Sequence, residues 1–280
     1  MLTALLLLPL LAPAGTLEDA TRAFQAGEFT KVLELARQGS TDETEAARLA
    51  YLAGEAQLVL GSPAEAERSF RAVLAKRPQA VPAQVGLGRA LLAQQDPKLL
   101  AEAGKVLDAA LAAEPKDAGV LTAHGLFLSV SGKSPEAMKE LEKAWKLDPR
   151  NALTARGYVE VLLRADDVPG AAAVAERFLE LRPEHPLGPF LMAWTLERDS
   201  EDEQAIERYQ EALKLDPTFL DAHKNLAILC HTLSNTYQDK ARTRLAFEHY
   251  ERYFALGGQD QGLKALHADL LNFKDQILGS

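Results

Sequence analysis

A recurring proline is the feature that most constrains how this chain can fold. Five prolines follow one another at intervals of roughly 34 residues, and only the first interval is longer, by three positions. They are Pro78, Pro115, Pro149, Pro183 and Pro217. Each closes a segment with the same apolar pattern, as in residues 137–149, 171–183 and 205–217. Self-similarity at a period of about 20–50 residues indicates a repeat architecture. The chain is therefore expected to be an array of one short unit rather than a single globule.

The residues ahead of each proline share one helical face. An alanine stands twelve positions before every one of these prolines, and apolar residues stand eight and five positions before it. The intervals fit one face of a helix with about 3.6 residues per turn, so these positions are predicted to form the core. They are Ala66, Phe70, Val73, Ala103, Leu107, Ala110, Ala137, Leu141, Ala144, Ala171, Ala175, Phe178, Ala205, Tyr209 and Ala212.

A second helix is predicted upstream of each of these helices. Proline disfavours the helical conformation in the residue before it, so Asp148, Arg182 and Asp216 are expected in turns. The upstream helices carry a small residue where two helices can cross closely, and glycines mark the turns between the helices. The small residues are Gly54, Gly88 and Gly125, and the turn glycines are Gly61 and Gly132. Each unit is therefore expected to be a helix-turn-helix.

This pattern resembles the tetratricopeptide repeat family, whose unit of about 34 residues has small residues at positions 8, 20 and 27, a large residue at 24 and proline at 32. The resemblance implies units at 47–80, 81–117, 118–151, 152–185 and 186–219. Val159 and Ala175 depart from the pattern, the first at a small position and the second at an aromatic one. The implied fold is all-α, a right-handed α-solenoid of about seven helix-turn-helix repeats with a C-terminal capping helix.

The flanking segments complete the predicted organisation. Residues 15–46 are interpreted as a degenerate first repeat, 47–219 as five repeats, 220–259 as an extended seventh repeat and 260–280 as the capping helix. Ala246 comes seven positions later than the pattern expects, so the stretch from Ser234 to Arg244 is predicted to lengthen both helices of the seventh repeat. The capping helix is expected to bury one apolar seam, formed by Leu263, Leu266, Leu270, Phe273 and Ile277.

The first 14 residues are typical of a secretory signal peptide. They form an uncharged, mostly apolar run that ends in Ala12-Pro13-Ala14, a small-x-small cleavage pattern. The run is shorter than the roughly 20 apolar residues that span a bilayer, so no transmembrane segment is expected in the mature chain. A buried first helix is the alternative, although Pro9 and Pro13 disfavour it. The protein is therefore expected to be exported to the periplasm or the extracellular medium.

Charge and cysteine content exclude several classes of function. The net charge of −9 would repel a phosphate backbone, which argues against a nucleic-acid partner. Cys230 is the single cysteine, so an intrachain disulfide is excluded. His223, Cys230 and His231 could be proposed as metal ligands, but Cys230 falls at a core position and helical neighbours diverge by about 100 degrees. We therefore expect no cofactor, no metal site, no catalytic residues and no enzyme activity.

The family resemblance implies which surface binds a ligand. In tetratricopeptide arrays the first helix of each unit lines a concave groove that holds an extended peptide or a partner helix. The groove residues implied here are Tyr51, Arg89, Leu126, Arg156, Glu160, Arg164, Phe190, Trp194, Arg198 and Lys224. Phe190 and Trp194 are four positions apart and could face the groove together or pack within the repeats. The cations could attract an acidic ligand.

The function expected from these features is that of a noncatalytic scaffold or adaptor. It would hold a peptide or helix of a protein partner in its groove and assemble or position a cell-envelope complex. Two alternatives stay open. One is binding of a nonprotein polymer such as cell-wall glycan through Trp194, and the other is a metal-dependent or enzymatic activity that the sequence conceals.

Overall fold

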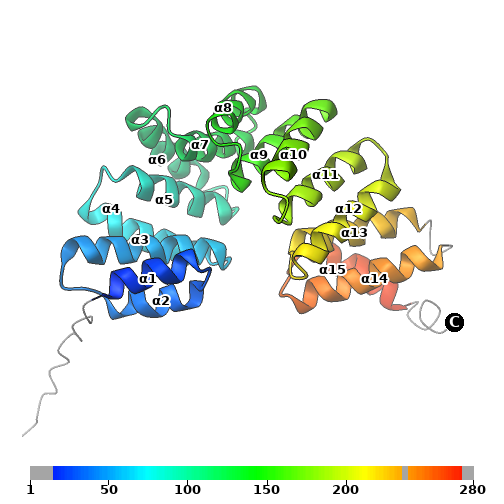
Figure 1. Cartoon of the computed structure of the whole chain (residues 1–280), viewed down its shortest axis with the longest axis horizontal. Coiled ribbons are helices and arrows are strands. Elements are labelled where there is room, and N and C mark those ends of the chain that lie inside the picture. The colour runs from blue at the N-terminus through cyan, green and yellow to red at the C-terminus, as the bar shows by residue number, and fades with distance from the viewer. Residues whose placement is uncertain (1–14, 235–238, 273–280) are drawn as a thin grey trace, which may run out of the picture. The chain divides into compact units, whose positions relative to one another are not determined.

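The computed structural model describes residues 15–234 and 239–272, and helices fill most of that span. The predicted signal peptide lies outside the described residues. The chain divides into two compact units, the first ending at Ala144 and the second beginning at Trp145 (Figure 1). The division falls inside one helix, α8, Ser134–Leu147. Among the described residues no helix is both long enough and apolar enough to cross a membrane.

The first unit contains α1 to α7 and most of α8. Consecutive helices pack against each other from α1 to α7, and the odd-numbered helices also contact one another, α1 with α3, α3 with α5 and α5 with α7 (Figure 1). The bounds of its first seven helices are α1 Thr16–Gln25, α2 Phe29–Gln38, α3 Glu43–Val59, α4 Pro63–Lys76, α5 Val81–Ala93, α6 Leu100–Ala113 and α7 Ala118–Val130.

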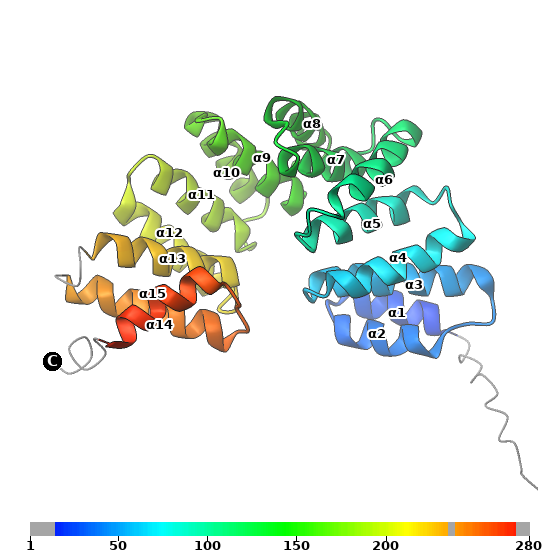
Figure 2. The ribbon, with the colours of Figure 1, turned by 180° about the vertical axis from the view of Figure 1, so that it is seen from behind.

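The second unit repeats this arrangement from α9 onward. Consecutive helices again pack in order, α9 also contacts α11, and α15 lies against α14 (Figure 2). The bounds are α9 Ala152–Arg164, α10 Val168–Leu181, α11 Leu187–Arg198, α12 Asp202–Leu215, α13 Leu220–Leu233, α14 Lys240–Ala255 and α15 Gln261–Asn272. The prediction of an all-α stack of helix-turn-helix pairs followed by one more helix is confirmed.

The prolines end helices in the way the sequence predicts. Helices α4, α6, α8, α10 and α12 each stop two positions before the proline of their repeat. The residue directly before that proline has left the helical region, with φ −138° and ψ 60° at Arg182 and φ −138° and ψ 97° at Asp216. Proline disfavours the helical conformation in its predecessor, so the helix ends at the same place in each repeat.

The predicted core positions are buried. All fifteen side chains that stand twelve, eight or five positions before a repeat proline are at most 5% exposed. The glycines of the first helices explain how they fit. A Cβ on Gly54 would lie 2.7 Å from Cζ of Phe70, and a Cβ on Gly88 would lie 2.5 Å from Cγ of Leu107. The first helix therefore has a glycine, which lacks a side chain, at the place where the large side chain of the second helix packs.

The two departures from the family pattern lie in the same helix pair. Val159 of α9 and Ala175 of α10 are both fully buried, and the two helices pack against each other. Here the first helix carries the larger side chain and the second the smaller one, which reverses the arrangement of Gly54 and Phe70. Volume-conserving exchanges of this kind are the core changes that proteins tolerate best.

Two expectations for the C-terminal segments need revision. Helix α13 ends at Leu233 and α14 begins at Lys240, so only part of the stretch from Ser234 to Arg244 is helical; residues 235–238 lie outside the described residues. In α15, Leu263 and Leu270 are buried, but Leu266 is 38% exposed. The prediction that Leu266 belongs to the buried seam is wrong. Steps of three and four residues place side chains on one broad side of a helix, but they do not determine how deeply each side chain is buried. Phe273 and Ile277 lie outside the described range.

Left-handed turns recur where the first helix of a pair ends. Gly27, Gly61 and Gly132 have φ between 70° and 75°, and three non-glycine residues occupy the equivalent place. These are Gln95 with φ 54°, Asp166 with φ 63° and Ser200 with φ 63°. A left-handed conformation costs an L-residue about 1–2 kcal/mol, so the chain tolerates local strain at three turns.

Replacing Ser200 by glycine should relieve this strain. We expect Ser200→Gly to raise the free energy of unfolding by about 0.5–1 kcal/mol, because glycine adopts positive φ without steric cost but loses more entropy on folding. The matched control is Ala109→Gly on an exposed site inside α6, which should lower stability by about 1 kcal/mol. Urea unfolding followed by circular dichroism measures both. Equal destabilisation by the two glycines would contradict the claim that the left-handed conformation of Ser200 lowers stability.

Candidate functional site

The predicted surface residues of the second unit come from neighbouring first helices. Helix α9 carries Arg156, Glu160 and Arg164, and α11 carries Phe190, Trp194 and Arg198. Steps of four residues place each set on one side of its helix, and α9 and α11 contact each other. Lys224 lies on α13. Apart from Phe190, which is buried, the side chains on α9 and α11 therefore lie along one strip.

A pocket of about 570 Å³, here called the Trp194 pocket, lies on this strip. Four of the predicted residues line it, Glu160, Arg164, Trp194 and Arg198, together with Leu163 and Glu197. The prediction missed these last two. Both stand three positions after a predicted member, Leu163 after Glu160 and Glu197 after Trp194, so the helical period could have indicated them.

The two aromatic residues of α11 have different environments. Trp194 is half-buried and lines the pocket. Phe190 is only 1% exposed, and its ring centroid lies 5.0 Å from that of Phe219 and 5.7 Å from that of Tyr209. The prediction that Phe190 contacts a ligand is therefore wrong, because aromatic neighbours from the following segments cover it. It instead supports Trp194, at a centroid distance of 5.9 Å.

Each predicted surface cation is neutralised by a carboxylate of the chain itself. Arg156 lies 2.6 Å from Asp221, Arg164 pairs with Glu160, and Arg198 lies 3.5 Å from Asp166. Lys224 lies 2.9 Å from Asp260, and in the first unit Arg89 lies 3.0 Å from Glu55. Such partly exposed pairs contribute little stability, about 0–1 kcal/mol each. Their effect on binding is larger, since none of these five cations is left without a carboxylate partner.

Glu197 connects the pocket to the core. The hydroxyl of the fully buried Tyr209 donates a hydrogen bond of 2.7 Å to Oε2 of Glu197, and the amide of Asn225 donates one of 3.3 Å to the Tyr209 hydroxyl. Burial raises the pKa of the Glu197 carboxyl, and Asp202 acts in the same direction, whereas the Tyr209 hydrogen bond opposes the rise. The carboxyl group is thus held in a fixed orientation at the wall of the pocket.

The first-unit residues are more dispersed. Tyr51 of α3 packs edge-on against Phe70 at 5.9 Å between ring centroids, and Leu126 of α7 is half-buried. Tyr51 lines a hollow of about 290 Å³ between α3, α4 and α5. Leu126 and Arg89 line neither this hollow nor the Trp194 pocket.

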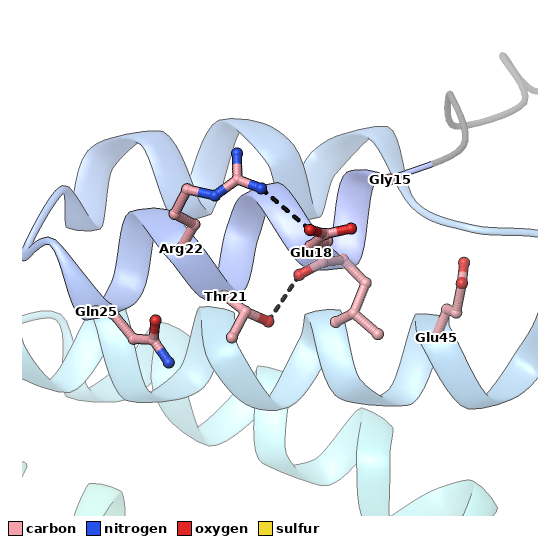
Figure 3. A pocket seen from close by; sticks show the side chains of 7 residues that line it. Gly15, Glu18, Thr21, Arg22, Gln25 and Glu45 are labelled. Atoms are coloured by element: carbon pink, nitrogen blue, oxygen red, sulfur yellow. Dashed lines mark hydrogen bonds and ion pairs between the residues drawn. The ribbon is translucent and has the colours of Figure 1, made fainter.

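A further pocket, of about 540 Å³, lies on α1 and the start of α3 (Figure 3). Its polar side chains are engaged locally. Arg22 donates a 3.1 Å hydrogen bond to Glu18, and the Thr21 hydroxyl donates one of 2.7 Å to the carbonyl of Leu17 (Figure 3). None of the predicted site residues lies here, and we assign it no role.

The three residues considered as metal ligands are not brought together. His223 Nδ1 lies 2.8 Å from Nδ1 of His249, and its Nε2 lies 3.1 Å from the carbonyl of Pro217. Cys230 is fully buried, and burial raises the pKa of its thiol to about 12. His231 contacts the hydroxyl of Tyr250 at 3.2 Å. Across residues 15–234 and 239–272, no group of three or more His, Cys, Asp or Glu side chains is placed to hold a metal ion.

Comparison with known families agrees with the observed fold. A family model described as "Tetratricopeptide repeat" matches residues 17–81, 51–118 and 123–186, and one described as "TPR repeat" matches residues 200–233. Together the matches cover more than half of the chain. No curated protein sequence gave a significant match.

Solved structures with a similar fold have low sequence identity. A tetratricopeptide repeat protein from Parabacteroides merdae aligns with TM-score 0.65 and 12% identity over 92% of this chain and 98% of its own. A chain of the APC/C hetero-tetramer Cut9-Hcn1 aligns with TM-score 0.65 and 16% identity over 92% of this chain, which spans only 49% of that chain. The pilF protein of Pseudomonas aeruginosa aligns with TM-score 0.54 and 21% identity over 81% and 98% of the two chains.

The His223–His249 contact predicts a pH-dependent stability. Burial, and then the neighbouring His223, lower the pKa of His249 from 6.5 to about 4. Between these values the unfolded chain binds a proton that the folded chain does not, so the stabilisation is complete above pH 6.5 and is lost as the pH falls toward 4. We expect the free energy of unfolding to drop by about 2 kcal/mol between about pH 7.5 and 4.5 from this residue.

Urea unfolding of the His249→Gln variant at both pH values measures this contribution. The variant should lose less stability on acidification than the natural chain, because its side chain does not titrate. An identical loss in both proteins would show that His249 does not contribute to the acid sensitivity.

Proposed function

The chain belongs to the tetratricopeptide repeat family, whose fold is typical of protein–protein interaction scaffolds, and we propose that it is a noncatalytic adaptor that binds a partner at the Trp194 pocket. The partner would be an extended peptide or a helix that lies across α9 and α11. The observation that carries the proposal is the half-buried Trp194 in a pocket built from two adjacent first helices. Tryptophan is among the residue types that most often dominate interface energies.

The charges around the pocket indicate how the partner would be recognised. Arg164 and Arg198 are each paired with a carboxylate, and Glu197 is fixed by Tyr209. The apolar surface of the half-buried Trp194 is therefore the main source of binding energy, with the ion pairs forming a polar rim. Binding should consequently depend little on salt concentration, in contrast to binding driven by unpaired charges.

A protein with a similar fold is part of a larger assembly. It is a chain of the APC/C hetero-tetramer Cut9-Hcn1, so in that protein the fold belongs to an assembly. For this chain we propose a corresponding role in assembling or positioning a complex of the cell envelope. The partner is expected to be a protein, since an extended strip with a single aromatic anchor suits a peptide segment.

Crosslinking from the pocket tests the adaptor function. A photoreactive phenylalanine derivative at position 194 should crosslink to a protein partner in living cells, whereas the same derivative at the buried Phe190 should crosslink only within the chain. The Trp194→Ala variant should bind the captured partner at least tenfold more weakly. Trp145→Ala, on α8 outside the pocket, is the matched control and should keep the affinity.

The outcome also distinguishes the alternatives. If position 194 captures no protein and the purified chain binds isolated cell-wall glycan in a manner that Trp194→Ala abolishes, the adaptor proposal is wrong and a glycan-binding function replaces it. Circular dichroism of both tryptophan variants establishes that the loss is not caused by unfolding.

We also propose that residues 1–14 direct export and are removed after Ala14. The mature protein should then begin at Gly15, directly before α1. Ala14→Phe should slow the processing, because signal peptidase requires a small residue there. Mass spectrometry of the protein from the periplasm or the medium measures the amino terminus. Recovery of the full chain with Met1 from the cytoplasm would contradict the proposal.

A further inference from the structure

The hollow beside Tyr51, here called the Tyr51 hollow, differs from the Trp194 pocket in its charge. It occupies about 290 Å³ on the first unit, and its lining includes Ala47, Arg48 and Tyr51 of α3, Val73 of α4, Arg77 at the end of α4, and Ala83 of α5. The floor is mostly apolar. Val73 is 5% exposed and Ala83 is 1% exposed, so the hollow lies directly over the core of this helix group.

Arg48 and Arg77 both line the hollow, and a hydrogen bond places Arg77 beside the helix that carries Arg48. A guanidinium nitrogen of Arg77 donates a hydrogen bond of 2.9 Å to the hydroxyl of Thr44. Thr44 and Arg48 are four positions apart on α3 and therefore project from the same side of this helix. The hydrogen bond thus draws Arg77 toward the helical face from which Arg48 extends.

Neither guanidinium is neutralised in the way the cations near Trp194 are. Arg48 and Arg77 form no ion pair with a carboxylate in the part of the chain that the structure describes. Of the acidic residues of α3, Glu43 lies 3.1 Å from Lys76 and Glu55 lies 3.0 Å from Arg89, while the Glu45 carboxylate accepts a hydrogen bond of 2.9 Å from Ser40 and keeps its charge. The edge of the hollow therefore has two guanidinium groups that no carboxylate of the described residues contacts as an ion pair.

Tyr51 adds no negative charge to this edge. Burial, and then the nearby Glu55, raise the pKa of the Tyr51 hydroxyl to about 12, so the side chain is neutral at physiological pH. Its ring is held by the edge-on contact with Phe70. The hollow thus combines a rigid aromatic wall, an apolar floor and two arginines.

We propose that the Tyr51 hollow is a second docking site, which takes a peptide segment that has a carboxylate beside a bulky apolar side chain. Arginine binds carboxylates through paired hydrogen bonds in a fixed planar geometry, and the apolar side chain would cover the floor that Val73 and Ala83 form. The site does not depend on the function proposed for the Trp194 pocket, because no residue lines both.

Short blocked peptides test the site on the full chain. The probes are acetyl-Gly-Asp-Leu-Gly-amide and its Asn analogue, which differ only in the negative charge. In NMR titrations the Asp peptide should shift the signals of Tyr51 and Ala83 with a Kd of about 1 mM, and the Asn peptide should bind about tenfold more weakly. Equal binding of the two peptides, or the absence of shifts at Tyr51 and Ala83, would overturn the proposal.

Neutral variants identify the groups responsible. Arg48→Gln and Arg77→Gln should each weaken binding of the Asp peptide about tenfold, and Gln at position 77 can still donate to Thr44. Arg68→Gln is the matched control, since Arg68 is an exposed arginine of α4 that pairs with Glu65 and does not line the hollow. Unchanged affinity in both test variants would refute the role of the arginines.

Two further measurements distinguish the Tyr51 hollow from the Trp194 pocket and from a lipid-binding site. The Trp194→Ala variant should bind the Asp peptide with unchanged affinity, so failure of one site can be told from failure of the other. Dodecanoate supplies the same chemistry from a lipid source. If dodecanoate shifts Tyr51 and Ala83 while the Asp peptide does not, the occupant is a fatty acid and the peptide proposal is wrong.

Discussion

The contact between the two helices of each pair is the constraint on which the rest of the structure depends. A large side chain of the second helix fills the space left by a small residue of the first, as Phe70 does against Gly54 and Leu141 against Gly125. One unit of this size cannot bury enough apolar area to offset the entropy of ordering its chain. Successive pairs must therefore share their cores, which fixes the spacing of alanines and prolines along the sequence and leaves the outward side of the first helices free to vary.

Most of the fold could be predicted because its determinants are local. The prolines, the alanines that precede them by a constant interval and the helical period identify the buried positions without knowledge of distant contacts. The turns at Gln95, Asp166 and Ser200 are harder to identify, since none of these residues is the glycine that positive φ favours most. The repeat period still contains that information, because Gln95 and Asp166 each stand one full repeat after a turn glycine, Gly61 and Gly132 respectively.

The site is less predictable, because the helical period indicates on which side of a helix a residue lies but not how deeply its side chain is buried. It placed Phe190 and Trp194 on one side of α11, yet Phe190 is covered by Tyr209 and Phe219 while Trp194 reaches the pocket. Charge compensation is equally hidden from the sequence. Arg156 pairs with Asp221 and Lys224 with Asp260, and both pairs join residues that are distant along the chain. A set of arginines that resembled an anion-binding surface is consequently close to neutral.

The overall charge of the chain affects how an acidic peptide would reach the Tyr51 hollow. A net charge of −9 opposes the approach of any acidic segment, and this would argue against a carboxylate at the Tyr51 hollow if the charges acted over long distances. At physiological ionic strength, however, interactions between exposed charges are screened beyond about 8 Å. A carboxylate within hydrogen-bonding distance of Arg48 and Arg77 therefore experiences mainly these two groups. The net charge would slow the encounter, whereas the local pair of arginines would determine the dissociation rate.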